Sequence, residues 1–461
     1  MRQHGRCSVG ESDSTLPLDR LAGLCKVISP EVIEQALSDS GRTGQKTCTL
    51  SHRTTLWLVL AMGVLTHLPI RQVFKHARRM VGGQKTPSRS NLCEARQRLG
   101  VEPVRSVFEQ VVRPLATPTT PGAFYKGLRL MGIDGTVLDT PDTPANAARF
   151  GRSSGGRGDG AFPQLRKVSL VELGTHIEVA LTIGGWQDSE QKLVERLWDK
   201  IPADALLLED RGFFSYKHWK TLDSRGLKLL VRIKSNMVFK PIRRLADGSY
   251  EAKIYRSSYD RDRDRNGVVV RIIEYTIDDP QRTGHGETHR LMTNLLDEER
   301  YPARELACLY HERWEEELVF DEQKTHLDPR RPGKPAHFRS QTPAGVEQEV
   351  YALSLGHFVV RALMLEAAKT DNLDVDRLSF TGCLRILQAR LPECESSTPA
   401  SLELWYRLLL EEMAHERIEP RRNRTNPRVV KRKMSKFAKK RPEHRGRPPL
   451  KKTFAQSVVI T

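Results

Sequence analysis

Two aspartates stand where each could bind a divalent cation. Asp134 closes an apolar run in GIDGT, and Asp210 closes a second one in LLLEDRGF. Open α/β sheets bind ligands at the carboxyl ends of their strands, so two such acids on neighbouring strands can share a cation. An aspartate before glycine is also a common turn residue, and Asp139, Asp142 and Glu209 are acids of similar promise. Glu209 precedes Asp210 in the strand and should point to the opposite face.

A third acid lies on a helical ridge between cations. Tyr310, Arg313, Glu317 and Lys324 are offset by 0, 3, 7 and 14 residues. At about 100° per residue all four fall within an arc of about 60° on one helix face. A carboxylate that meets a metal between two phosphate-binding cations suits a helix lying along a DNA backbone. The alternative is an ordinary charged face, with Arg313 and Glu317 as an i, i+4 ion pair.

The segments around the aspartates predict a mixed sheet with helices packed on it, an α/β fold. Strands are expected at 128–134, 165–173, 176–183, 205–210 and 227–233, and helices at 189–201 and 216–223. From 234 to 297 the pattern becomes strands with the turn dipeptides Asp247-Gly248 and Asn266-Gly267, which predicts a β-rich insertion. Helices resume at about residue 302 and continue to about 410.

The region up to about residue 118 predicts helices and ends in the linker ATPTTPG. Residues 70–80 carry one apolar stripe, and residues 88–99 start a second helix that Gly100 can end. Two such helices resemble a helix-turn-helix, whose candidate DNA contacts are Arg89, Asn91, Arg96 and Arg98. A plain helical hairpin is the alternative, because the turn is longer than three or four residues.

Length and composition exclude several classes of protein. A chain of 461 residues exceeds what one hydrophobic core usually serves, so we expect two or three domains. The longest apolar run, 55–70, is shorter than a bilayer needs and contains His67, so we expect a buried helix and no membrane partner. The seven cysteines form no CxxC pair, and the N-terminus lacks a secretory pattern, which favours free thiols in a reducing compartment.

The net charge of +18 is concentrated near the C-terminus. Residues 421–452 hold fifteen basic residues and one acid, which leaves +4 for the other 429 residues. Such a block predicts binding to a polyanion, nucleic acid before membrane, with a solvated tail as the alternative. Within it, Arg445-Gly446-Arg447-Pro448 resembles an AT-hook core, whose arginines enter a narrow minor groove, although four residues in an arginine-rich tail also match by chance.

These motifs together resemble the DDE transposases of bacterial insertion sequences, in the branch of insertion sequence 4. The branch signature Tyr-x2-Arg-x3-Glu-x6-Lys is matched without a gap from Tyr310 to Lys324. ARQRLG at 95–100, DGTVLDTPDTPAN at 134–146 and FPQLRKVSLVELGTH at 162–176 also look like family sequence. The 106 residues between Asp210 and Glu317 suit a family that inserts a β-rich subdomain there.

The resemblance implies a ribonuclease-H-like mixed-sheet core whose catalytic and metal-binding acids are Asp134, Asp210 and Glu317. It implies two Mg²⁺ ions per active site, for which Mn²⁺ can substitute. The domains expected are a helical DNA-binding domain at 1–118, the catalytic core at 119–233 and 301–415, the β-rich insertion at 234–300, and a basic, disordered tail at 416–461 that is not part of the family pattern.

The resemblance also implies the partners and the reaction. Tyr310, Arg313 and Lys324 would contact DNA phosphates, and Trp314 would stack on a base at the cleaved end. The expected function is cut-and-paste transposition, in which a homodimer binds the terminal inverted repeats of an element, cleaves the strands and joins them to target DNA. A bacterial cytoplasmic location at the nucleoid follows.

Three other readings compete with this one. A metal-dependent nuclease on the same fold needs the three acids but forms no joined product. A transposase descendant that only binds DNA is opposed by the intact acids and signature. A basic interaction scaffold does not explain a carboxylate amid the cations of one helical ridge.

Overall fold

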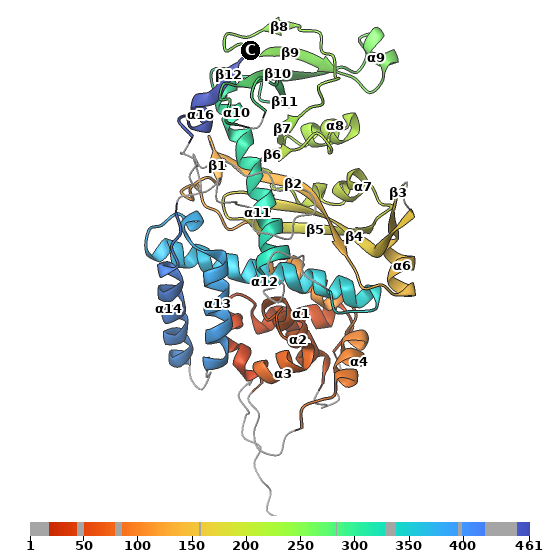
Figure 1. Ribbon diagram of the computed structural model, residues 1–461, viewed down its shortest axis with the longest axis vertical. Helices are drawn as coiled ribbons and strands as arrows, with labels where there is room; N and C mark the ends of the chain where they lie inside the picture. Colours follow the sequence, from red (N-terminus) through yellow and green to blue (C-terminus); the bar gives the residue numbers. More distant parts are fainter. Residues whose placement is uncertain are drawn as a thin grey trace, which may run out of the picture.

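The computed structural model describes residues 18–43, 50–78, 85–155, 158–282, 284–327, 338–394, 399–419 and 450–461. Figure 1 shows a helical part at one end and a large sheet at the other, with the long helix α12 (Pro343–Thr370) between them.

Helices form the N-terminal part, as the apolar spacing predicts. They are η1 (Asp19–Lys26), α1 (Pro30–Asp39), α2 (His52–Val64), α3 (Ile70–Ala77), α4 (Arg89–Leu99) and α5 (Glu102–Val111). Ser88 caps α4 by accepting a hydrogen bond from Asn91 N at 3.1 Å, which satisfies one free N–H of the first turn. Gly100 ends the helix with a φ of 77°, a conformation that glycine adopts without strain.

The long helix α12 joins the N-terminal helices to the C-terminal ones in a single core. The C-terminal helices are η5 (Val375–Arg377), α13 (Phe380–Arg390), η6 (Leu391–Glu393) and α14 (Pro399–His415). A Cβ on Gly63 of α2 would lie 1.8 Å from Ala352 O of α12, so glycine permits this close helix contact. The C-terminal helices, expected to belong with the catalytic core at 301–415, share one hydrophobic core with the N-terminal helices and with sheet residues such as Leu138 and Ile183.

Helix α12 is long and apolar enough to cross a membrane by length and composition. However, most of its apolar stretch is buried inside the protein, so α12 is a core helix. The run at 55–70, expected to be buried, is the buried helix α2.

The sheet begins with three antiparallel strands, β2 (Leu128–Asp139), β4 (Gly158–Glu172) and β5 (Ile177–Gly185). Strands β6 (Ala205–Glu209) and β7 (Lys228–Arg232) then add in parallel to β2. The resulting order β5-β4-β2-β6-β7 is the ribonuclease-H-like arrangement, which confirms the predicted mixed sheet. Two short strands, β1 (Phe124–Tyr125) and β3 (Arg152–Gly155), pair with β2 and β4.

Helices cover both faces of this sheet. One face packs on α7 (Glu190–Glu195), η2 (Trp198–Lys200) and α8 (Tyr216–Ser224), and α6 (Pro144–Phe150) lies beside β4. The other face is crossed by a segment at 303–326, which comprises α10 (Ala303–Tyr310), η3 (His311–Trp314), α11 (Glu315–Asp321) and η4 (Glu322–His326). We call residues 303–327 the Glu helix. Figure 1 shows it running from the end of the sheet that is farthest from α12 to α12 itself.

The β-rich segment extends the same sheet. Its elements are β8 (Arg243–Arg244), β9 (Tyr250–Ile254), α9 (Ser258–Asp262), β10 (Val268–Ile277) and β11 (His289–Thr293), and β11 pairs with β7. The two predicted turns are present, since Gly248 and Asn266 have φ values of 88° and 55°. The expected insertion is therefore continuous with the core through hydrogen bonds between strands.

The end of the chain departs from the expected tail at 416–461. Residues of α16 (Phe454–Ser457) and β12 (Val458–Ile460) return to the sheet, where β12 pairs with β10. Arg445 and Arg447, the AT-hook candidates, lie outside the described residues.

Candidate active site

Asp134 and Asp210 are neighbours across two parallel strands. The last pair in the ladder between β2 and β6 is Ile133 with Glu209, so the next residue on each strand is one of the two aspartates. Asp134 does not close its strand as expected, because β2 continues to Asp139 in its pairing with β4. Both aspartates are half-buried, at the place where β6 ends.

The charges around Asp134 act on it in opposite directions. Burial raises the pKa of Asp134 above its ordinary value, and the nearby carboxylates of Glu190 and Asp210 raise it further. A hydrogen bond of 2.7 Å from Gly135 N and the charge of Arg313 act to lower it. Two half-buried acids that repel each other are a setting that a divalent cation would stabilise.

Glu209 faces the other side of the sheet, as the alternation of side chains predicts. Its Oε1 lies 2.7 Å from His218 Nε2, and the Trp198 indole N–H donates to His218 Nδ1 at 3.0 Å. Because the indole can only donate, Nε2 carries the proton that goes to Glu209. Glu209 therefore belongs to the packing of α8 against the sheet, away from Asp210.

The Glu helix is not one uniform α-helix. A 3₁₀ turn, η3, precedes α11, and a π-helical turn, η4, follows it. The 3₁₀ turn winds more tightly than an α-helix, and the π turn winds less tightly. The arc expected at 100° per residue is therefore only approximate for Tyr310, Arg313, Glu317 and Lys324. The side chains show where each of them goes.

Tyr310 and Arg313 face the two aspartate strands. Tyr310 is 7% exposed, and its hydroxyl donates to Glu209 O at 3.1 Å. The expected phosphate contact of Tyr310 is therefore not supported, because its polar atom is used inside the protein to hold the end of β6. Arg313 Nη1 lies 3.4 Å from Glu316 Oε2, and the charges of Asp134 and Asp210 help to raise the pKa of Arg313.

Glu316 and Glu317 are adjacent but have opposite environments. Glu316 is fully buried over Gly132, where a Cβ would lie 1.5 Å from Glu316 Oε1, and burial raises the pKa of Glu316 well above its usual value. Glu317 is exposed on α11, the helix that lies against β2. Of these two neighbouring acids, Glu317 is the one that solvent can reach.

Lys324 lies beside the Asp134 strand. Its ammonium donates to Thr136 Oγ1, two residues beyond Asp134 in β2. Burial, together with the charge of Lys167, lowers the pKa of Lys324 to about 8. The backbone of Trp314 belongs to η3, but its side chain lies outside the described part of the structure.

A buried polar cluster lies beneath the Glu helix, and no sequence pattern indicates it. His176 Nε2 is 2.5 Å from Glu315 Oε2 and 3.7 Å from Asp376 Oδ1, and an Arg361 N–H donates to His176 Nδ1 at 2.5 Å. His176 has a φ of 57°, a conformation that its side-chain bonds help to hold. Because the Arg361 guanidinium lies beside the His176 imidazole, we interpret these groups as an ion-paired cluster with a structural role.

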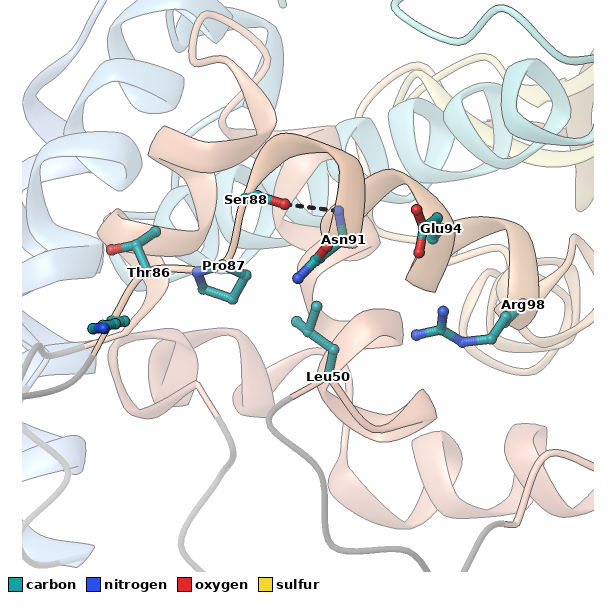
Figure 2. Close-up of a pocket in the computed structure, with 8 residues that line it drawn as sticks. Leu50, Thr86, Pro87, Ser88, Asn91, Glu94 and Arg98 are labelled. Atoms are coloured by element: carbon teal, nitrogen blue, oxygen red, sulfur yellow. Dashed lines mark hydrogen bonds between the residues drawn. The ribbon is translucent and has the colours of Figure 1, made fainter.

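The N-terminal basic residues divide between surface and interior. Arg89 and Arg98 are exposed on α4, and Figure 2 shows Asn91, Glu94 and Arg98 on the helix face that borders a hollow of about 580 Å³ beside Leu50. Arg96 points inward, where its guanidinium binds Gln348 Oε1 and Glu349 Oε1, each at 3.2 Å. The expected DNA contact of Arg96 is therefore wrong, because the side chain is 6% exposed and is bound to α12.

Replacing Arg96 with methionine is expected to lower the free energy of unfolding by about 3 kcal/mol, because Glu349 would keep a buried charge without its partner. Arg98→Met, on the exposed face of the same helix, should change the free energy of unfolding by less than about 0.5 kcal/mol. Urea denaturation measures both. A stable Arg96→Met variant with weakened DNA binding would contradict the interior role.

Comparisons with known proteins agree with this architecture. Residues 18–109 match the family described as "Insertion element 4 transposase N-terminal", and residues 126–355 match "Transposase DDE domain". Transposase InsG for insertion sequence element IS4 of Escherichia coli strain K12 is 28% identical over 434 residues, which cover 90% of this chain and 93% of that protein.

Two further similarities are weaker. Putative transposase InsZ of the same organism is 30% identical over 145 residues, 31% of this chain and 48% of that protein. The structure of a piggyBac transposase synaptic complex with hairpin DNA has a TM-score of 0.43 and 12% identity, and the match covers 86% of this chain and 85% of that one.

Proposed function

Because this chain belongs to the insertion sequence 4 family of DDE transposases, we propose that Asp134, Asp210 and Glu317 are the catalytic acids with which it cleaves DNA and transfers strands. The observation that carries this assignment is the register of β2 and β6, which makes the two aspartates neighbours under the Glu helix. Glu317 is the accessible acid of the helix segment that lies against β2.

The donor set fits Mg²⁺. All three side chains offer carboxylate oxygens, the ligands that this ion prefers, and the neighbouring charges of Glu190 and Asp210 add to burial in raising the pKa of Asp134. When bound, two divalent cations activate an attacking oxygen and stabilise the leaving oxygen of an in-line displacement at phosphorus. Mn²⁺, with a similar preference for oxygen, is expected to substitute.

The remaining residues of the site prepare it for DNA. Tyr310 holds the backbone from which Asp210 projects, and Arg313 lies among the acids and balances their charge. Lys324, beside Thr136 on the Asp134 strand, is the cation that we assign to a DNA phosphate next to the scissile bond. Trp314 is assigned to a base at the cleaved end.

The proposal extends to the DNA molecules that the protein binds and to its assembly as a dimer. The substrates are the terminal inverted repeats of an insertion sequence and a target duplex in the bacterial cytoplasm, held by a synaptic homodimer at the nucleoid. Arg89 and Arg98, exposed on α4, contact the element end, and Arg445 and Arg447 contact DNA from the basic segment.

A cleavage and joining assay on the DNA that flanks this gene tests the function. With Mg²⁺ present, the protein is expected to release the element ends and join them to a second duplex. Cleaved ends without joined products would favour the nuclease, and tight binding without cleavage would favour a DNA-binding relic. Either result would overturn the proposed reaction.

The low pKa of Lys324, about 8, predicts a pH dependence of DNA binding. Only the charged amine attracts a phosphate, so the affinity should fall as the pH rises past 8, by roughly tenfold at one unit above the pKa. Lys324→Arg keeps its charge at these pH values and should flatten the profile. Titrations of a labelled element end between pH 7 and 9 measure this effect, with Lys200→Arg as the surface control. An identical profile in Lys324→Arg would contradict the contact.

A further inference from the structure

The Glu helix contains a π-helical turn between two of the residues assigned to the reaction. In η4 the backbone N of Leu327 donates to Glu322 O at 2.7 Å, a bond that spans five residues. This turn takes up more residues than an α-helical one and so rotates the side chains that follow it. The turn lies after Glu317 and includes Lys324, so it sets how these two side chains are oriented relative to each other.

Gln323 ties the turn to the sheet. Its Oε1 accepts a hydrogen bond from Lys167 Nζ at 2.6 Å, and its Nε2 donates to Glu178 Oε2 at 2.9 Å. Lys167 also binds Glu178 Oε1 at 2.7 Å, so the amide closes a ring of three bonded groups. All three side chains are at most 2% exposed, where unmade hydrogen bonds are costly.

Glu322 ties the same turn to α12. Arg361 Nε and His357 Nε2 each lie 2.9 Å from Glu322 Oε2, and a second Arg361 nitrogen binds Glu322 Oε1. The paired guanidinium and the imidazole lower the pKa of Glu322 well below its usual value. The turn is thus fixed by fully buried charges on β4, β5 and α12.

The next residue in the turn is Lys324, which binds Thr136 of β2, the cross-strand partner of Lys167 on β4. Three consecutive side chains therefore reach α12, the β4–β5 pair and β2. Lys167 and Lys324 also share an aromatic neighbour, because their ammonium groups lie 5.7 and 5.6 Å from the centroid of the Phe320 ring.

We propose that Glu322 and Gln323, with Lys167, Glu178 and Arg361, form a clamp that positions Lys324 for the reaction by holding the π turn. This inference rests on the proposed function, because Lys324 is the group whose placement the clamp serves. Glu322 and Gln323 are positioning residues and contact no substrate themselves.

A double-mutant cycle tests the coupling. Gln323→Leu and Lys324→Met are each expected to slow single-turnover cleavage of a prebound DNA end by about 10²-fold, the scale of a misplaced catalytic group. The double variant should be no slower than the slower single variant, because both changes remove the same contact. Rates that multiply in the double variant would overturn the proposal.

A charge exchange within the clamp keeps the test independent of folding. Gln323→Glu alone sets two carboxylates against Lys167, and it should slow cleavage. Adding Glu178→Gln restores one acid and one amide, and it should return the rate to within about threefold of the native protein if the bonds act through geometry. Failure of the exchange to restore the rate, with a native melting temperature, would also overturn the clamp.

Asn294→Leu is the matched control. Asn294 makes three hydrogen bonds in the sheet, to Leu229 N, Asp223 Oδ1 and Leu227 O, far along the chain from the π turn. It should lower the melting temperature without slowing cleavage below that temperature. If Asn294→Leu cleaves DNA as slowly as Gln323→Leu does, the lower cleavage rate comes from lower stability, and the clamp is refuted. A native protein that neither cleaves nor joins DNA would instead refute the proposed function.

Discussion

Replacing Glu317 with glutamine is expected to slow DNA cleavage and strand transfer by about 10³-fold or more and to leave DNA binding intact. The change keeps the size of the side chain and removes the charge that a metal ligand needs. If the transition state loses several kcal/mol of stabilisation by the metal, the rate falls by about this factor. Quantified joined and cleaved products, with a gel-shift titration for binding, measure the two effects separately.

The adjacent residue supplies the control. Glu316 is buried over Gly132, and burial raises its pKa and so favours the uncharged carboxyl, whose shape Glu316→Gln keeps. This variant should retain most of the cleavage rate and the native stability. Equal loss of activity in both variants would show that the helix segment, and not the Glu317 carboxylate, is what matters.

Asp210→Asn should have an effect of the same order as Glu317→Gln, because it removes one of the two neighbouring acids that follow the β2–β6 ladder. Its neighbour Glu209 has a separate role in holding His218 on the opposite face. Glu209→Gln should lower the free energy of unfolding by about 1 kcal/mol and retain cleavage below its melting temperature.

The comparison is made with cleavage assays at a temperature where both variants are folded, and with denaturant titrations for stability. An active Asp210→Asn variant, or an inactive and stable Glu209→Gln variant, would mean that β6 presents its acids to the wrong faces. The proposal that Asp210 is a catalytic acid would then fail.

Local patterns predicted much of this architecture. The Ser88 cap, Gly100 and the turn residues Gly248 and Asn266 act through their own backbone geometry, so the sequence near each of them is sufficient. The opposite directions of Glu209 and Asp210 follow from the alternation of side chains in a strand.

Features that depend on distant partners were predicted less well. Arg96 has the exposed-helix composition of its neighbours, and only the position of α12 turns it inward. Tyr310 matches a phosphate-contact pattern, but the end of β6 takes its hydroxyl. Asp134 is followed by a glycine that suggests a turn, whereas pairing with β4 keeps the strand extended to Asp139.

The π turn could not be predicted from helical periodicity, because its stabilising partners are far away in the sequence. Lys167, next to Arg166, and Arg361 lie in largely apolar runs, and their carboxylate partners become evident only when β4, β5 and α12 meet. A regular helix at 100° per residue therefore gives an approximate ridge for the signature residues and misses the turn that ends it.

Binding of Mn²⁺ to the DNA-bound protein, measured by electron paramagnetic resonance, tests the central claim most directly. The native protein is expected to bind two ions per active site. Asp210→Asn and Glu317→Gln should each lose or weaken this binding, while Glu209→Gln and Glu316→Gln should bind as the native protein does. Equal Mn²⁺ binding in all five proteins would contradict a metal centre built from Asp134, Asp210 and Glu317.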